Sequence, residues 1–143
     1  MLRLFLFFLL ILNLSLVFSE SLHNFKILRV IDGDTLVIEA NYLPEPLKPE
    51  LKLRIIGVDT PEKGSRAKCD EERILSNKAK SFVERQIKIA TNIHIKLDSW
   101  DKYGGRVLGD VILDGKSLKN ESLNAKLAKY YDGGKKSSWC RNK

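Results

Sequence analysis

Five short segments with alternating apolar and polar residues, each bounded by turn-forming residues, constrain the fold of this chain most strongly. The five segments are residues 25–31, 35–40, 51–58, 92–97 and 106–113. An alternation with a period of two is typical of strands that bury one face. Residues 70–90 and 117–129 instead repeat apolar residues every three or four positions, which predicts two amphipathic helices.

The order of these elements limits the architecture. Three strands, a helix, two strands and a second helix around one core predict a small closed or partly open barrel with helices packed on it. We therefore expect a mainly β fold with helices, a five-stranded OB-fold barrel with two packed α-helices. The length of the chain suits a single domain over residues 20–143.

The first nineteen residues have the pattern of an export signal. Arg3 makes the start basic, an apolar run follows from Leu4 to Leu12, and Ser19 offers a small residue at the cleavage position. An uncleaved anchor is the alternative, although the apolar stretch is shorter than the roughly 20 residues that span a bilayer. We expect a cleaved signal peptide, no stable membrane insertion after cleavage, and a secreted or periplasmic protein.

The net charge and the cysteines carry weaker signals. A formal net charge of +7 favours a polyanionic partner such as nucleic acid, but solubility explains it almost as well. Cys69 and Cys140 are the two cysteines, and an even count in an oxidising compartment favours a disulfide. This bridge would close a loop of about 70 residues and contribute about 4 kcal/mol to stability. Neither cysteine has a second cysteine or a histidine at metal-ligand spacing, so a zinc site is not expected.

Two acidic segments, Asp32–Thr35 and Asp59–Glu62, suggest a cation site. Asp34 and Asp59 lie at the ends of strands that should be neighbours, so their carboxylates can converge. Oxygen ligands without histidine or cysteine favour Ca²⁺ or Mg²⁺. Each segment alone has an ordinary structural explanation, since Asp-Gly-Asp forms turns and Asp-Thr-Pro-Glu ends strands.

Three further side chains fit phosphate chemistry. Arg54 lies inside a strand at an otherwise apolar position, so it needs an anionic partner, either a core carboxylate or a bound phosphate. Arg106 follows a glycine turn, where it can project over a site or remain a solvated hairpin residue. Glu62 follows Pro61 and could accept a proton from an attacking water, with helix capping as the alternative.

Three motifs in this order resemble the staphylococcal nuclease (thermonuclease) family. They are Ile31-Asp-Gly-Asp-Thr35, Leu53-Arg-Ile-Ile-Gly-Val-Asp-Thr-Pro-Glu62 and Asp101-Lys-Tyr-Gly-Gly-Arg106. The resemblance extends over roughly residues 25–131. It implies an OB-fold nuclease that hydrolyses DNA and RNA with Ca²⁺ and leaves 3′-phosphate ends.

The resemblance also implies roles for individual residues. Three groups would bind Ca²⁺: Asp34, Asp59 and the backbone carbonyl of Thr60. Two arginines would hold the phosphate and stabilise its charge in the transition state: Arg54 and Arg106. Glu62 would act as the general base or orient the attacking water.

Contacts to the substrate are less well defined by the resemblance. We expect them from Lys102, Tyr103, Tyr130 and Tyr131. The two tyrosines after the second helix do not align cleanly with the base-stacking tyrosines of the family's best-known member. That member also has one glycine where this chain has Gly104 and Gly105, and the extra residue could shift the following arginine.

From the sequence we expect a monomeric, secreted, Ca²⁺-dependent endonuclease that acts on DNA or RNA with little sequence preference. The main alternative is a catalytically inactive OB-fold module that binds nucleic acid through a basic groove and aromatic residues. An exported component of nutrient or DNA uptake is a weaker alternative. The acidic residues separate these hypotheses, because a protein that only binds nucleic acid does not need carboxylates facing a phosphate.

Overall fold

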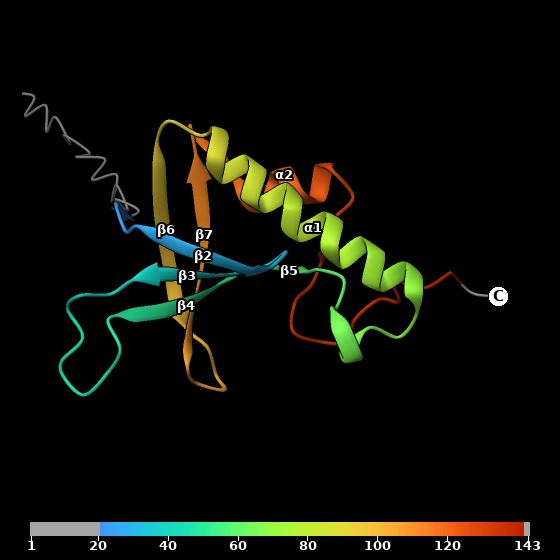
Figure 1. Cartoon of the computed structure of the whole chain (residues 1–143), viewed down its shortest axis with the longest axis horizontal. Coiled ribbons are helices and arrows are strands. Elements are labelled where there is room, and N and C mark those ends of the chain that lie inside the picture. Colours follow the sequence, from blue (N-terminus) through green and yellow to red (C-terminus); the bar gives the residue numbers. More distant parts are fainter. Residues whose placement is uncertain (1–20, 142–143) are drawn as a thin grey trace, which may run out of the picture.

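The computed structural model describes residues 21–141 (Figure 1), so the expected signal peptide lies outside the described residues. In chain order the elements are β1 (Leu22–His23), β2 (Ile27–Asp32), β3 (Thr35–Glu39), β4 (Glu50–Ile55), β5 (Val58–Asp59), the 3₁₀ turn η1 (Gly64–Arg66), α1 (Asp70–Ile89), β6 (Ile93–Trp100), β7 (Arg106–Leu113), β8 (Lys116–Ser117), α2 (Leu118–Asn124) and β9 (Lys129–Tyr130). The five expected strands correspond to β2, β3, β4, β6 and β7, and both expected helices are present.

The main sheet is mixed and strongly curved. Its strand order is β1-β6-β7-β4-β3-β2, with β8 paired to β7. Neighbours are antiparallel except β4 and β7, which run parallel. Within residues 21–141 no pairing joins β1 to β2, so the OB-like barrel is partly open rather than closed.

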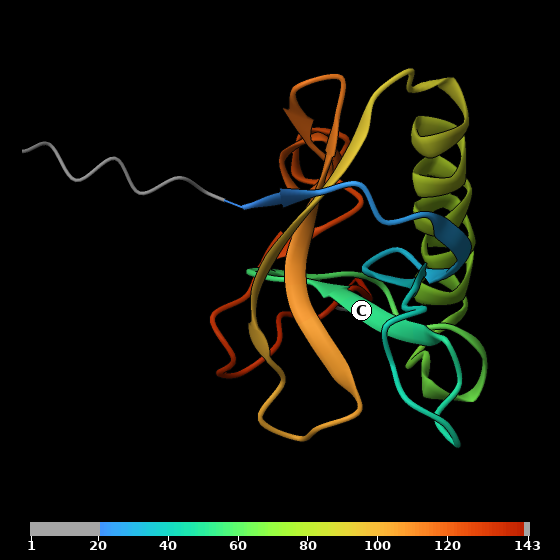
Figure 2. The same cartoon turned by 90° about the vertical axis from the view of Figure 1, so that its left-hand side faces the viewer.

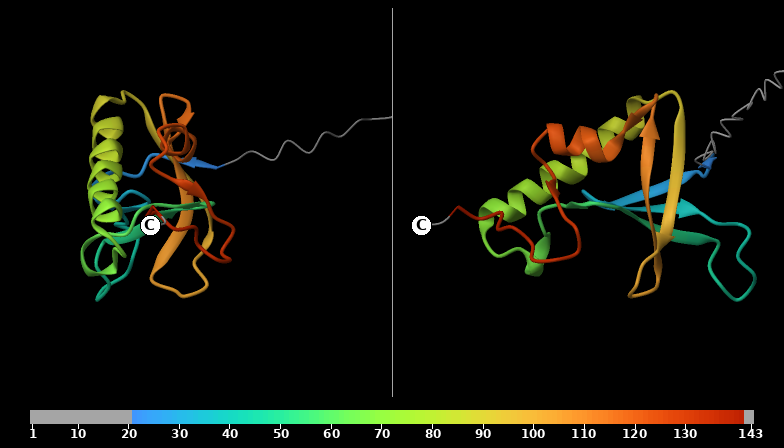
Figure 3. Two further views of the ribbon diagram at one scale, coloured as in Figure 1. Left: turned by 90° about the vertical axis from the view of Figure 1, so that its right-hand side faces the viewer. Right: turned by 180° about the vertical axis from the view of Figure 1, so that it is seen from behind.

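The two helices cover one side of the sheet. In Figure 2, α1 stands along one side of the curved strands, and the β6–β7 hairpin lies on the other side. The short helix α2 contacts both α1 and β7. The described C-terminal end lies beside the start of α1, as both views of Figure 3 show. No helix within residues 21–141 is long and apolar enough to cross a membrane.

The sequence explains where α1 begins. Asp70, Glu71 and Glu72 fill its first turn, where negative charge stabilises the helix dipole. The Cys69 sulfur accepts a hydrogen bond from the Glu72 N–H at 3.4 Å. Glu72 is also buried, with 4% of its surface exposed. Glu72 is therefore not part of the solvated face of this helix.

Two expected boundaries differ from the observed ones. The third strand breaks at Gly57, whose φ of 79° lies in the left-handed region, so β4 and β5 are separate strands. The second helix ends at Asn124 instead of residue 129, because Lys126 adopts a left-handed conformation with a φ of 57°. Its N-cap is Ser117, whose hydroxyl accepts a hydrogen bond from the Asn120 N–H.

One apolar core joins the sheet and the helices. Its buried side chains are Leu36, Ile38, Leu53, Ile55, Val58, Val83, Ile95, Val111, Leu113, Leu118 and Ala128. A Cβ atom at Gly109 would lie 2.3 Å from the Lys96 carbonyl oxygen, so glycine lets β7 approach β6 closely there. This core holds β3, β4 and β7 in fixed register, and candidate site residues come from the turn before β3, the end of β4 and the start of β7.

Candidate active site

The carboxylate of Asp34 is buried at the turn between β2 and β3. Its Oδ1 atom lies 2.6 Å from Arg54 Nη1 and accepts a hydrogen bond from the Thr35 hydroxyl at 2.9 Å. Its Oδ2 atom accepts a hydrogen bond from the Thr60 hydroxyl at 2.9 Å. Thr35 pairs with Arg54 in the β3–β4 ladder, which explains why the turn carboxylate meets the strand guanidinium.

Burial changes the protonation of Asp34. With 4% of its surface exposed, the side chain is desolvated, and this raises its pKa to about 6 although Arg54 lowers it. Near neutral pH the Asp34 carboxylate is therefore ionised in the native protein at a cost in folding free energy. A cation that binds this carboxylate would favour the ionised form and offset that cost.

In the absence of metal, we expect Asp34 to make the free energy of unfolding fall as pH rises from about 4 to 6. Between its ordinary pKa of 3.8 and about 6, the native protein keeps a proton that the unfolded chain has lost. The decrease should amount to about 2–3 kcal/mol and be absent from Asp34→Asn. Urea unfolding of both proteins in chelator between pH 4 and 7 measures it. Parallel stability profiles would contradict the raised pKa.

The two arginines of the predicted site line one cleft of about 790 Å³. Arg54 reaches it from β4, and Arg106 reaches it from the start of the neighbouring parallel strand β7. Beside its bond to Asp34, Arg54 donates from Nη2 to the Val58 carbonyl at 3.3 Å. Arg106 donates from Nε to Asp101. Each guanidinium is thus oriented by a carboxylate and presented to the same space.

Asp101 is a positioning residue that the sequence analysis missed. It is buried at the base of the β6–β7 hairpin, and its Oδ1 accepts a hydrogen bond from the Tyr103 N–H at 2.9 Å. This N–H, followed by the Arg106 side chain, lowers the pKa of Asp101. Gly104 and Gly105 have φ angles of 74° and 73° and accommodate the extra residue of the turn. The sequence feature that could have identified Asp101 is its position at the start of the motif Asp101-Lys-Tyr-Gly-Gly-Arg106.

Asp59 and Glu62 lie beside this cleft. Asp59, with 3% of its surface exposed, lines a smaller cavity of about 180 Å³, and Glu62 lines both cavities. The Asp59 Oδ2 atom accepts a hydrogen bond from Trp139 Nε1 at 3.1 Å. Lys136 Nζ lies 2.7 Å from Asp59 Oδ1 and 2.9 Å from Glu62 Oε1. The contact with Asp59 Oδ1 is an ion pair without hydrogen-bond alignment, so this buried atom has no hydrogen-bond partner among the described residues.

The loop that carries Glu62 is held by a buried carboxylate. Glu72 Oε1 accepts a hydrogen bond from the Glu62 N–H at 3.2 Å, and Glu72 Oε2 accepts one from the Lys68 N–H at 2.7 Å. The Glu62 side chain itself pairs with Arg66, whose Nε lies 3.2 Å from Oε2. Helix α1 thus positions the candidate base through Glu72.

The donor chemistry of the site suits a hard divalent cation. Asp34, Asp59 and Thr60 offer oxygen only, and the contact of Lys136 with Asp59 and Glu62 shows that a cation can lie against these carboxylates. Among residues 21–141, one group of three His, Cys, Asp or Glu residues has its ligand atoms within 4.8 Å of one another. This group consists of Cys69, Glu72 and Cys140. Both of those cysteines are in a disulfide, so that group is not a metal site.

The expected substrate contacts lie in different places. Lys102, Tyr103 and Tyr131 line the large cleft, whereas Tyr130, at 82% exposure, is not among its lining residues. The Lys102 ammonium lies 5.0 Å from the centre of the Tyr103 ring. Trp100 also lines the cleft and is 57% exposed. An exposed tryptophan at the cleft is suited to stack on a base.

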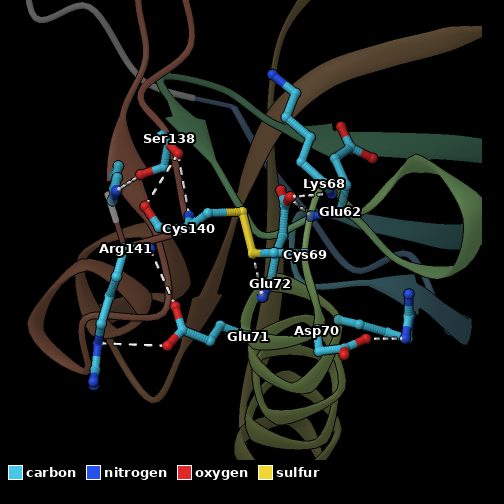
Figure 4. Close-up of a disulfide and its surroundings, with 11 residues drawn as sticks. Glu62, Lys68, Cys69, Asp70, Glu71, Glu72, Ser138, Cys140 and Arg141 are labelled. Carbon is cyan, nitrogen blue, oxygen red and sulfur yellow. Dashed lines mark hydrogen bonds and ion pairs between the residues drawn. A yellow bond between two sulfur atoms is a disulfide. The ribbon is translucent and has the colours of Figure 1, made fainter. Parts of the chain in front are cut away.

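The predicted disulfide is present. Cys69, just before α1, is bonded to Cys140 near the C-terminus, with their Cα atoms 6.0 Å apart (Figure 4). Arg141 next to it donates its N–H to Glu71 at 3.1 Å. The C-terminal segment is therefore attached to the start of α1, close to the loop of Glu62.

Comparisons with known proteins agree with this geometry. The profile of the family described as Staphylococcal nuclease homologue matches residues 52–137, more than half of the chain. Thermonuclease of Staphylococcus hyicus is 34% identical over 104 residues, which cover 70% of this chain and 54% of that protein. The uncharacterized protein MJ1439 of Methanocaldococcus jannaschii is 32% identical over 123 residues, or 73% of this chain and 55% of that protein. The chain thus spans about half the length of these curated relatives. With its OB-like fold and paired cleft arginines, the chain belongs to the staphylococcal nuclease family.

Proposed function

We propose that this protein is an exported, Ca²⁺-dependent endonuclease that hydrolyses DNA and RNA with little sequence specificity and leaves 3′-phosphate ends. The observation that carries the proposal is the meeting of Arg54 and Arg106, from two neighbouring strands, in one cleft that Asp34 and Glu62 also line. A phosphodiester matches paired guanidiniums in charge and hydrogen-bonding geometry.

In the proposed reaction, a water oxygen forms a bond to phosphorus while the bond from phosphorus to the 5′ oxygen breaks. Glu62 accepts the proton of the attacking water, and the leaving oxygen takes a proton from solvent. The guanidiniums of Arg54 and Arg106 stabilise the charge that develops on the phosphoryl oxygens. Asp34, Asp59 and the Thr60 carbonyl would hold Ca²⁺, which neutralises phosphate charge and lowers the pKa of water when bound.

Low sequence specificity follows from the kind of contacts that the cleft offers. Arginine and lysine side chains bind the phosphate backbone, which carries no sequence information. Trp100, Tyr103 and Tyr131 present ring faces, and stacking on a ring face tolerates any base. Export is supported by the apolar N-terminal stretch of the sequence and by the Cys69–Cys140 disulfide, since such bonds form in oxidising compartments.

Incubation of the purified protein with plasmid DNA and with single-stranded RNA tests the proposal. We expect cleavage with Ca²⁺ and none with a chelator, because the metal is needed to neutralise the scissile phosphate. The DNA products should support primer extension only after phosphatase treatment, which reports 3′-phosphate ends. A parallel preparation of Arg106→Ala controls for contaminating nucleases. Binding without cleavage in Ca²⁺, Mg²⁺ or Mn²⁺ would instead identify an inactive nucleic-acid-binding module.

A further inference from the structure

A lysine of the C-terminal segment lies against two carboxylates of the candidate site. Lys136 Nζ is 2.7 Å from Asp59 Oδ1 and 2.9 Å from Glu62 Oε1. Burial lowers the pKa of Lys136, but the two carboxylates outweigh it and raise the pKa above its ordinary value. The ammonium is therefore charged near neutral pH. This positive charge is in contact with the two residues that the proposed reaction uses as a metal ligand, Asp59, and as a base, Glu62.

Several contacts hold Lys136 at this place. Trp139 follows it by three residues and donates to Asp59 Oδ2 at 3.1 Å. Lys129 donates from Nζ to the Ser138 carbonyl at 2.6 Å, and its ammonium lies 4.3 Å from the centre of a Trp139 ring. Beyond these contacts, Cys140 is covalently bonded to Cys69 at the start of α1 (Figure 4). On the other side of Lys136, strand β9 pairs with β5, so the segment is held both before and after this lysine.

We propose that Lys136 is an internal cation that competes with the divalent metal for Asp59 and Glu62. We propose further that the Cys69–Cys140 disulfide keeps the Lys136 ammonium close to these two carboxylates. The inference rests on the proposed function, because it takes Asp59 as a metal ligand. A metal ion that binds Asp59 must displace the ammonium from Oδ1. Breaking the disulfide lengthens the free segment and lowers the effective concentration of the ammonium at the carboxylates.

The expected effect follows from competition for one site. When the competent form of a site is populated only in part, the apparent dissociation constant rises by the inverse of that fraction. An ammonium that occupies the carboxylates for about nine-tenths of the time would weaken Ca²⁺ binding roughly tenfold. Lys136 is therefore a determinant of metal affinity, and the oxidised protein needs more Ca²⁺ than the reduced one.

Calorimetric titration with CaCl₂ tests the proposal without any activity assay. Lys136→Met removes the charge and retains an unbranched side chain, and Lys135→Met is the matched control. Lys135 is exposed, and its side chain has no polar partner among residues 21–141. We expect Lys136→Met to bind Ca²⁺ roughly tenfold more tightly than the wild type and Lys135→Met to change affinity less than twofold.

Reduction of the disulfide supplies the second arm of the test. In wild type that remains folded by near-ultraviolet circular dichroism, reduction should tighten Ca²⁺ binding. In Lys136→Met it should have little effect, since the competing charge is already gone. An equal effect of reduction in both proteins would overturn the role of the disulfide.

The remaining outcomes separate this inference from the proposed function. Equal affinities of wild type and Lys136→Met, or weaker binding by Lys136→Met, would overturn the competition while leaving a Ca²⁺-dependent nuclease in place. Equal gains in Lys135→Met and Lys136→Met would also overturn it, because they indicate a general effect of net charge. The absence of Ca²⁺ binding in all proteins at millimolar concentration would overturn the proposed Ca²⁺ dependence and the competition together.

Discussion

Arg54→Ala and Arg106→Ala are each expected to lower kcat by about 10³-fold. Both guanidiniums line the cleft from neighbouring strands, so each can stabilise charge on the same phosphoryl group. Steady-state hydrolysis of a short oligonucleotide at saturating Ca²⁺ measures the loss. Arg106→Ala should leave the fold nearly unchanged, because Asp101 keeps the hydrogen bond from the Tyr103 N–H.

Arg29→Ala is the matched control for this prediction. Arg29 lies on β2, pairs with Glu50 at 2.8 Å, is half exposed and does not line the cleft. Its replacement removes the same charge and should leave kcat within about twofold, because surface charges mainly affect association. Full activity of either cleft variant would refute the proposed role of that arginine. A comparable loss in Arg29→Ala would show that net charge, rather than the cleft, controls the rate.

Removal of the disulfide should produce the largest change in stability. The bond joins residues separated by 71 positions, so Cys69→Ala with Cys140→Ala should lower the free energy of unfolding by about 4 kcal/mol. The physical reason is the greater conformational freedom of the unfolded chain once the loop is open. Urea unfolding with an m-value fitted separately for each protein measures the change.

The reduced wild-type protein is the control for the double variant. Both lack the bond, so their unfolding midpoints should agree, and both should lie below that of the oxidised protein. A loss below about 1 kcal/mol would contradict a loop-closure contribution and indicate residual structure in the unfolded chain.

Local sequence patterns predicted the five longer strands and both helices because their causes are local, but not the two-residue strands β1, β8 and β9. Alternation marked the strands, and the spacing of apolar residues marked α1, which runs over Asp70–Ile89. The exact ends were less predictable. The break at Gly57 and the early end of α2 at Lys126 depend on left-handed backbone conformations that apolar periodicity does not report.

The sequence by itself determined the chemistry available to the site: the carboxylates, the two arginines and their order in motifs of the staphylococcal nuclease family. Only the tertiary structure decided which of these groups meet. The register of Thr35 with Arg54 brings the guanidinium to Asp34, and the disulfide brings Lys136 and Trp139 to Asp59. These contacts join residues far apart in the chain, and their formation depends on long-range packing rather than on local sequence preference.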